Sequence, residues 1–228
     1  MASRRPAKDQ PASFEWTPDN KAWCDAQMKK YPDGRQASCV IPFLWRGQKQ
    51  EGWCTIAMME AIARQLDMPY IRVYEVATFY TMFNLAPVGE FFVQLCGTTP
   101  CMLRGAHELR ETCKKVIGAE NHVSDDGKFS WLEVECLGAC ANAPMIQIST
   151  KDGDHYYEDL TPEILEEMLA KLRRGEEVKI GTQHPDRHTS DPAGENTTLT
   201  DPSLYDGSRA QPLREIPNAN PEAASQGG

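Results

Sequence analysis

The chain has 228 residues, of which 40% are hydrophobic, and its formal net charge at pH 7 is -9. Nucleic acids and anionic membrane surfaces attract concentrated Lys and Arg, so an acidic chain is not expected to bind nucleic acid. No apolar run approaches the roughly 18 residues that a membrane-spanning helix needs, so direct membrane insertion is not expected either.

Residues 1–16 are expected to form an amino-terminal extension. Arg4 and Arg5 are not followed by the apolar segment of a secretion signal. We therefore expect the chain to stay in a reducing compartment, where its eight cysteines are more often ligands or buried thiols than disulfides.

Residues 17–86 are predicted to form a helical bundle. Four helices are expected, at 18–30, 38–50, 55–66 and 73–83. Cap residues and a stop glycine indicate their ends, and apolar residues at helical spacing indicate their buried faces. The residues predicted for this core are Val76, Phe79, Tyr80 and Phe83, with Phe43, Leu44, Trp45 and Trp53 expected to join them, although some of these aromatics could instead face a partner protein.

Two pairs of cysteines mark a second domain, predicted over residues 87–180. Cys96 and Cys101 have four residues between them, and Cys136 and Cys140 have three. Each pair directly follows a stretch that is rich in strand-forming residues. This spacing predicts that the four thiols are ligands of one metal site.

The segment between the pairs supports this prediction. Strands are expected at 90–95 and 129–135, and a helix at 103–117. The helix spans roughly 22 Å and the second strand roughly 23 Å, so the helix can return the chain to a strand parallel to the first. The usual right-handed connection would then place both strand ends at the same edge of the sheet.

Spacing alone does not decide which metal the thiols bind. A structural zinc site also uses four cysteines at such intervals and remains an alternative. The residues around the pairs, at 97–100, 137–139 and 141–144, are small and neutral. Backbone of this kind can approach a cluster and direct N–H groups at its sulfurs, which favours a 2Fe-2S cluster with two thiolates on each iron. Cys24, Cys39, Cys54 and Cys113 have no partner at ligand spacing and are expected to be core residues.

The remaining part of the second domain is predicted to be a hairpin and a helix. Strands at 145–148 and 155–157 are joined by a turn, and Thr161 caps a helix that Gly175 ends. Strand, helix, strand, hairpin and helix are the elements of a thioredoxin-like layer. The predicted fold class is α+β, a helical bundle followed by a thioredoxin-like α/β domain and an extended carboxy-terminal tail.

Residues 181–228 are predicted to be this tail. They contain six of the sixteen prolines and few large apolar residues, so they cannot build a core. The tail is expected to be disordered or to bind along a partner as an extended arm, with the arm favoured. His184 and His188 are expected to be solvated, because Pro185 between them excludes a helical metal-binding pair.

Several motifs together resemble the 2Fe-2S subunit of the NADH-dehydrogenase module of respiratory complex I. They lie at 31–36, 73–83, 96–101 and 137–144, and the resemblance extends over about residues 15–180. Related diaphorase subunits occur in NAD-linked hydrogenases and formate dehydrogenases.

The resemblance implies a function beyond the spacing of the thiols. In the family the four cysteines that match Cys96, Cys101, Cys136 and Cys140 bind one 2Fe-2S cluster. The cluster exchanges one electron at a time with FMN in a partner flavoprotein subunit that also binds NADH. The resemblance further implies a large iron-sulfur subunit as a second partner, and a place in the peripheral arm on the cytoplasmic or mitochondrial matrix side of the membrane. This chain, which lacks a glycine-rich dinucleotide loop, is then an electron-carrier subunit of NADH-quinone oxidoreductase with no complete active site of its own. A diaphorase subunit, a stand-alone ferredoxin and a zinc-stabilised scaffold are the alternatives.

Overall fold

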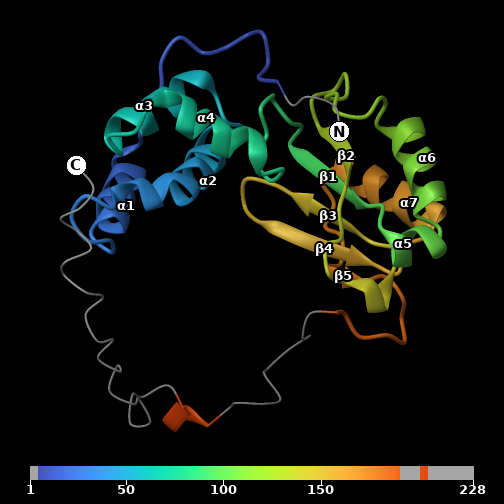
Figure 1. The fold of residues 1–228 in the computed structure, drawn as a ribbon. Helices are drawn as coiled ribbons and strands as arrows, with labels where there is room; N and C mark the ends of the chain where they lie inside the picture. Colours follow the sequence, from blue (N-terminus) through green and yellow to red (C-terminus); the bar gives the residue numbers. More distant parts are fainter. Residues whose placement is uncertain (1–4, 191–200, 205–228) are drawn as a thin grey trace. The chain divides into compact units, whose positions relative to one another are not determined.

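The computed structural model describes residues 5–190 and 201–204 (Figure 1). The chain divides into a compact unit at residues 1–191 and a second unit at 192–228. In the second unit only the short turn η3 (Pro202–Leu204) is described, so the predicted arm lies largely outside the described residues.

The first elements of the compact unit are helical, as the sequence predicts. They are α1 (Pro18–Met28), the 3-10 turn η1 (Gln36–Cys39), α2 (Val40–Glu51), α3 (Ile56–Gln65) and α4 (Tyr70–Phe79). The caps have physical causes. The Thr17 hydroxyl accepts a hydrogen bond from the Asn20 N–H at 3.3 Å, and the Thr55 hydroxyl accepts one from the Met58 N–H at 3.0 Å. Gly52 ends α2 in the left-handed region, at φ 84°.

The prediction for α4 is wrong at both ends. The helix begins at Tyr70, directly after Pro69, and ends at Phe79 because Tyr80 adopts an extended conformation. The predicted apolar stripe therefore runs past the end of the helix. Phe83 is fully buried, but Phe79 is 75% exposed and Tyr80 40% exposed, and α4 buries Val73 and Ala77 instead.

One apolar core lies among the helices. Phe43 and Leu44 belong to it as predicted, whereas Trp45 is about one-third exposed. The segment before α1 also contributes, because Phe14 and Trp16 pack against this core. The Trp16 indole N–H donates to Gln65 Oε1 at 2.8 Å. Phe14 and Trp16 thus hold the segment before α1 against the helices.

The second half of the compact unit is a five-stranded sheet. Its strands are β1 (Phe91–Cys96), β2 (Phe129–Val134), β3 (Ile146–Ser149), β4 (Asp154–Glu158) and β5 (Gly181–Thr182), in the order β2-β1-β3-β4-β5. Strand β1 is parallel to β2, as expected from the sequence, and antiparallel to β3. The predicted hairpin is β3 and β4. Together with the leading helices, this mixed sheet confirms the α+β class.

Three helices accompany the sheet: α5 (Thr99–Leu103), α6 (Ala106–Val116) and α7 (Pro162–Arg173). Helices α6 and α7 lie side by side (Figure 1). The sequence predicts one helix at 103–117, but Gly105 at φ 105° separates α5 from α6. A left-handed residue cannot continue a right-handed helix, so the connection consists of two helices.

The core under α6 and α7 fixes the path from β1 to β2. Val93 and Trp131 of the sheet are fully buried in it, together with Leu109 and Cys113 of α6. The indole N–H of Trp131 also donates to the Gly118 carbonyl at 2.9 Å, just beyond the end of α6. This bond joins β2 to the return of the helix, and therefore helps to fix where β2 lies beside β1.

The sheet extends beyond the predicted start of the tail at residue 181. Gly181 pairs with Tyr157 and Thr182 pairs with Glu158 in a parallel ladder. The residues after β5 belong to the compact unit as well, and His184 and His188 are exposed on it.

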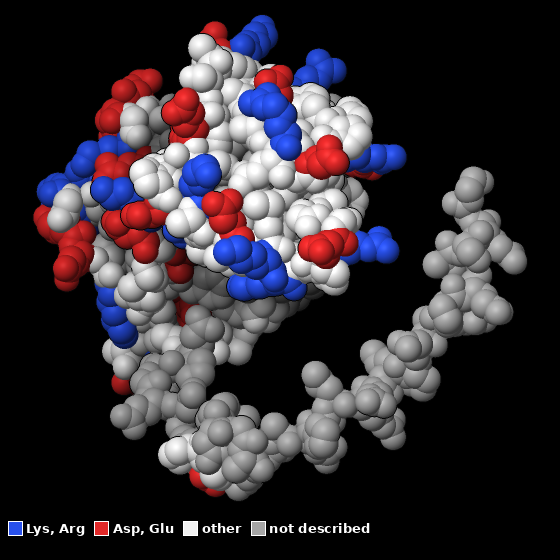
Figure 2. All heavy atoms as spheres, turned by 90° about the vertical axis from the view of Figure 1, so that its left-hand side faces the viewer, with Lys and Arg blue, Asp and Glu red and all other residues white. Residues whose placement is uncertain are grey.

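Within residues 5–190 and 201–204, no helix has the length and hydrophobicity of a membrane span. On the face shown in Figure 2, Lys and Arg are interspersed with Asp and Glu. Binding to a phosphate backbone needs basic residues gathered on one face, and this face does not offer that arrangement.

Candidate metal centre

The parallel ladder of β1 and β2 brings the two cysteine pairs to one edge of the sheet. Cys96 is the last residue of β1 and is paired with Val134, two residues before Cys136. The Gly97 N–H donates to the Val134 carbonyl at 3.2 Å and so extends the ladder past Cys96. The chain then turns into α5 on one side and into the loop at 135–139 on the other.

Cys96 and Cys101 form the buried half of the site. Each is only 1% exposed, and both lie in a small cluster with Ala106, Ala139 and Met145. The sequence predicts a helix only from residue 103, but Cys101 already lies within α5, which begins at Thr99. The Cys101 thiol lies near that of Cys96, which contributes to raising the pKa of Cys101.

Cys136 and Cys140 form the exposed half. Their sulfur atoms lie 3.5 Å apart, and Cys140 begins the 3-10 turn η2 (Cys140–Asn142). The Gly138 N–H donates to the Cys136 sulfur at 3.4 Å. The Cys96 thiol is among the groups that lower the pKa of Cys136, so thiols of both pairs lie at this edge of the sheet.

The pKa values of the two exposed thiols, Cys136 and Cys140, are shifted in opposite directions. The N–H of Gly138 and then the thiol of Cys140 lower the pKa of Cys136, because both donate to its sulfur. The hydrogen bond with Cys136 raises the pKa of Cys140. Burial, and then the hydrogen bond with Cys96, raises the pKa of Cys101 to about 12.

These shifts predict an order of alkylation in the metal-free chain. The ordinary pKa of a thiol is 9.0. At a pH below this value, a thiol with a lowered pKa has a larger fraction of thiolate, and the thiolate is the nucleophile. Iodoacetamide at neutral pH is therefore expected to modify Cys136 first, Cys140 more slowly and buried Cys101 last. Peptide mass spectrometry over a pH series measures this order. Equal rates for Cys136 and Cys140 would contradict it.

The donor set fits a 2Fe-2S cluster. Four thiols in two pairs can supply two thiolates to each iron. The surroundings are small residues, Ala139 and Ala143 among them, so main chain can come close to the sulfurs.

The other four cysteines are core residues, as predicted. Cys24, Cys39, Cys54 and Cys113 are all fully buried. Burial raises the pKa of Cys113 to about 12, so it stays protonated and unreactive.

Sequence reasoning missed several groups that hold the cysteine loops. The Thr98 hydroxyl lies 3.5 Å from the Cys96 sulfur, and the Tyr156 hydroxyl donates to the Leu137 carbonyl at 2.6 Å. Arg187 donates to the Ala141 carbonyl. Thr98 could have been found, because it lies between two predicted ligands. Tyr156 and Arg187 come close only through the hairpin and β5.

A family model described as "Thioredoxin-like [2Fe-2S] ferredoxin" matches residues 24–173. The fold and the converging thiols agree with that description, and the match includes all four cysteines. The chain belongs to the thioredoxin-like [2Fe-2S] ferredoxin family, whose cofactor is one 2Fe-2S cluster.

Within that family the chain is similar to subunits of NADH-quinone oxidoreductases. It is 53% identical over 208 residues to one such subunit of Rhizobium meliloti, covering 89% of this chain and 74% of the relative. It is 48% identical over 163 residues to an NADH-quinone oxidoreductase subunit of Rickettsia bellii, covering 71% of this chain and 95% of the relative.

A solved structure of an NAD+-reducing [NiFe]-hydrogenase, in the H2-reduced state, has a similar fold. The TM-score is 0.51 at 12% sequence identity, over 60% of this chain. This chain corresponds to only 22% of that hydrogenase chain. At such identity the likeness concerns the fold alone.

Proposed function

We propose that this chain is the one-electron carrier subunit of an NADH-quinone oxidoreductase of the complex I type. In this proposal Cys96, Cys101, Cys136 and Cys140 are the ligands of its 2Fe-2S cluster. The observation that carries the proposal is the convergence of these four thiols at one sheet edge. The chain is 53% and 48% identical to two NADH-quinone oxidoreductase subunits. This identity favours a subunit of a quinone-reducing enzyme over a diaphorase subunit of a hydrogenase.

The buried and the exposed cysteines have different roles at this site. Cys96 and Cys101, 1% exposed, anchor the site from inside the domain. Cys136 and Cys140 are exposed and form the side that a partner can approach. When bound, a 2Fe-2S cluster accepts and returns one electron at a time. Four thiolates without histidine favour a low potential, nearer the roughly -400 mV of plant-type ferredoxins than that of histidine-ligated centres.

The proposal includes partners and a location. The electron partner is FMN in a separate flavoprotein subunit, which also binds NADH, and a large iron-sulfur subunit completes the module. The chain would lie in the peripheral arm, on the cytoplasmic or matrix side of the membrane. The domain organisation proposed is a helical domain at 17–86 and a cluster domain from 87, with the carboxy-terminal tail as an arm for a partner.

Electron exchange with the flavoprotein tests the proposal directly. The full chain is reduced with dithionite, freed of reductant, and mixed anaerobically with the oxidised flavoprotein in a stopped-flow instrument. Because the cluster should have a low potential, we expect the reduced chain to transfer electrons rapidly to the flavin. The flavin absorption should fall as the chain is reoxidised. Flavoprotein stripped of FMN is the control. No faster flavin reduction than with free FMN, or zinc without acid-labile sulfide in the chain, would contradict the proposal.

A further inference from the structure

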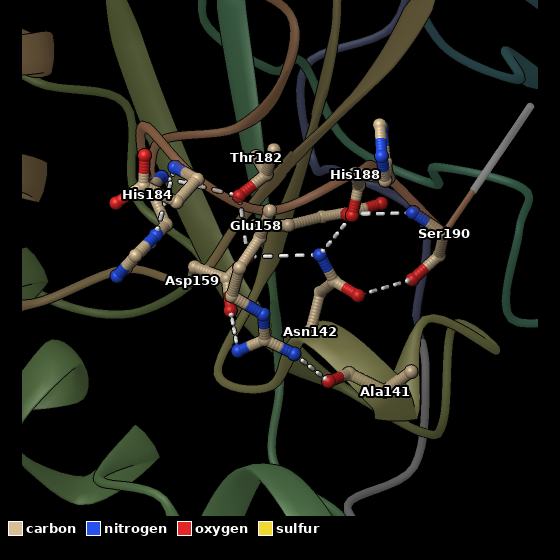
Figure 3. Close-up of polar contacts among 10 residues, drawn as sticks. Ala141, Asn142, Glu158, Asp159, Thr182, His184, His188 and Ser190 are labelled. Carbon is tan, nitrogen blue, oxygen red and sulfur yellow. Dashed lines mark hydrogen bonds and ion pairs between the residues drawn. The ribbon is translucent and has the colours of Figure 1, made fainter. Parts of the chain in front are cut away.

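The segment after β5 lies against the turn that carries Cys140, as Figure 3 shows for the labelled residues. Arg187 donates one guanidinium N–H to Asp159 Oδ1 and another to the carbonyl oxygen of Ala141. The Asn142 side-chain amide donates to Asp159 Oδ2 at 2.8 Å and to the His188 carbonyl at 2.7 Å. The two residues that follow Cys140 are therefore both held by this segment.

These contacts are built around a buried carboxylate. The Asp159 side chain is 6% exposed, and it also accepts from the Thr182 hydroxyl of β5. The main-chain N–H of Asp159 also donates to the Asn142 carbonyl at 2.8 Å. Asp159 and Asn142 are therefore joined both through their main chains and through their side chains. A hydrogen bond between an ionised donor and an ionised acceptor is about twice as strong as a neutral one, and the planar guanidinium fixes the direction of both its bonds.

The other end of the same loop is also fixed. The Tyr156 hydroxyl donates to the Leu137 carbonyl at 2.6 Å, three residues before Cys140. Cys140 thus lies between two anchored points, although it is itself exposed. Because η2 is a single short turn, the place of the Cys140 sulfur depends on these anchors more than on its own packing.

We propose that Arg187 is a positioning residue for the metal centre. Arg187 bridges Asp159 and the Ala141 carbonyl, and thereby holds Cys140 in ligating geometry. This inference rests on the proposed assignment of Cys140 as a ligand. It also gives residues 183–190, expected from composition to belong to a tail, a role in the site. Groups that orient ligands in this way typically change metal affinity by 10–100-fold when they are mutated.

Arg173 offers a matched control. It donates to Asp126 Oδ2 at 2.8 Å and reaches the Val116 carbonyl at 3.5 Å, so it too bridges a carboxylate and a main-chain oxygen. The side chains of Arg173 and Arg187 are both 38% exposed. Arg173 also lies over the ring of Phe129, the first residue of β2, at the end of that strand opposite to Cys136.

The test measures iron release from the full-length cluster-loaded chain to a ferrous chelator under anaerobic reduction, together with the electron paramagnetic resonance spectrum. We expect Arg187→Gln to release iron roughly tenfold or more faster than wild type and to change the g values. Arg173→Gln should match wild type in both. Arg187→Lys keeps the charge but not the two-branched geometry, so its rate should fall between those of wild type and Arg187→Gln.

Circular dichroism separates positioning from misfolding. Should Arg187→Gln fail to fold, the folded Arg187→Lys variant decides by the same two readouts. Rates and spectra equal to those of Arg173→Gln would overturn the positioning role, while loss of the cluster from Cys140→Ala would keep the ligand assignment intact. A Cys140→Ala chain that keeps its full iron and sulfide would overturn the ligand assignment, and the role of Arg187 with it.

Discussion

Replacing any one of Cys96, Cys101, Cys136 or Cys140 by alanine is expected to remove most of the iron and acid-labile sulfide from the purified chain. Alanine offers no donor atom, so one iron is left with a single protein ligand. The exposed positions make the sharper test, because Cys136→Ala and Cys140→Ala remove no buried packing. Iron and sulfide analysis with the visible absorption of the cluster measures the loss.

Cys113→Ala is the matched control for these variants. Cys113 lies in sequence between the two pairs, but it is fully buried in α6, among the core residues under the sheet. Its substitution removes one sulfur from a core and is expected to lower stability modestly while the iron and sulfide content stays that of wild type. Loss of the cluster from Cys113→Ala, or its retention in Cys136→Ala, would mean that the ligand set is wrong.

The place of these thiols was predictable because it depends on local signals and one topological rule. Strand-forming residues end at Cys96 and before Cys136, and a connecting helix of suitable length predicts parallel strands. The structure has this pairing, from Phe91 with Phe129 to Cys96 with Val134. Spacing alone left zinc open, and the family match decides for a 2Fe-2S cluster.

The errors arise where backbone conformation interrupts a side-chain pattern. Phe79, Tyr80 and Phe83 have helical spacing, but spacing does not show that the helix ends at Phe79. The helix at 103–117 was predicted to be continuous, yet Gly105 adopts a positive φ and divides it. Apolar periodicity reports which residues could share a face, and it says little about where the backbone leaves the helix.

The role of residues 183–190 was hidden for another reason. Pro185 and the polar residues around it are typical of a tail, and composition predicts a core only through apolar side chains. Here the segment is held by polar contacts instead, above all by Arg187 on Asp159. Asp159 precedes Arg187 by 28 residues. No local pattern connects the two, so only the sheet, which places β5 beside β4, brings them together.

The second large effect is expected from Trp131→Ala, which should lower the free energy of unfolding by about 3–5 kcal/mol. Trp131 of β2 is fully buried in the core under α6 and α7, and its indole N–H donates to the Gly118 carbonyl. The substitution leaves a large cavity and removes the partner of that carbonyl. Urea denaturation followed by far-ultraviolet circular dichroism measures the change.

Two further variants show whether the cost comes from this packing. Trp131→Phe keeps most of the apolar contact but lacks the hydrogen bond. It should therefore lower the free energy of unfolding by less than Trp131→Ala does. Trp45→Ala removes a tryptophan that is 36% exposed and should cost less than either. Because β2 carries the chain to Cys136, the loosened sheet should also release iron faster in Trp131→Ala than in Trp45→Ala. Equal unfolding free energies for these two variants would show that Trp131 does not fix the strand beside the metal centre.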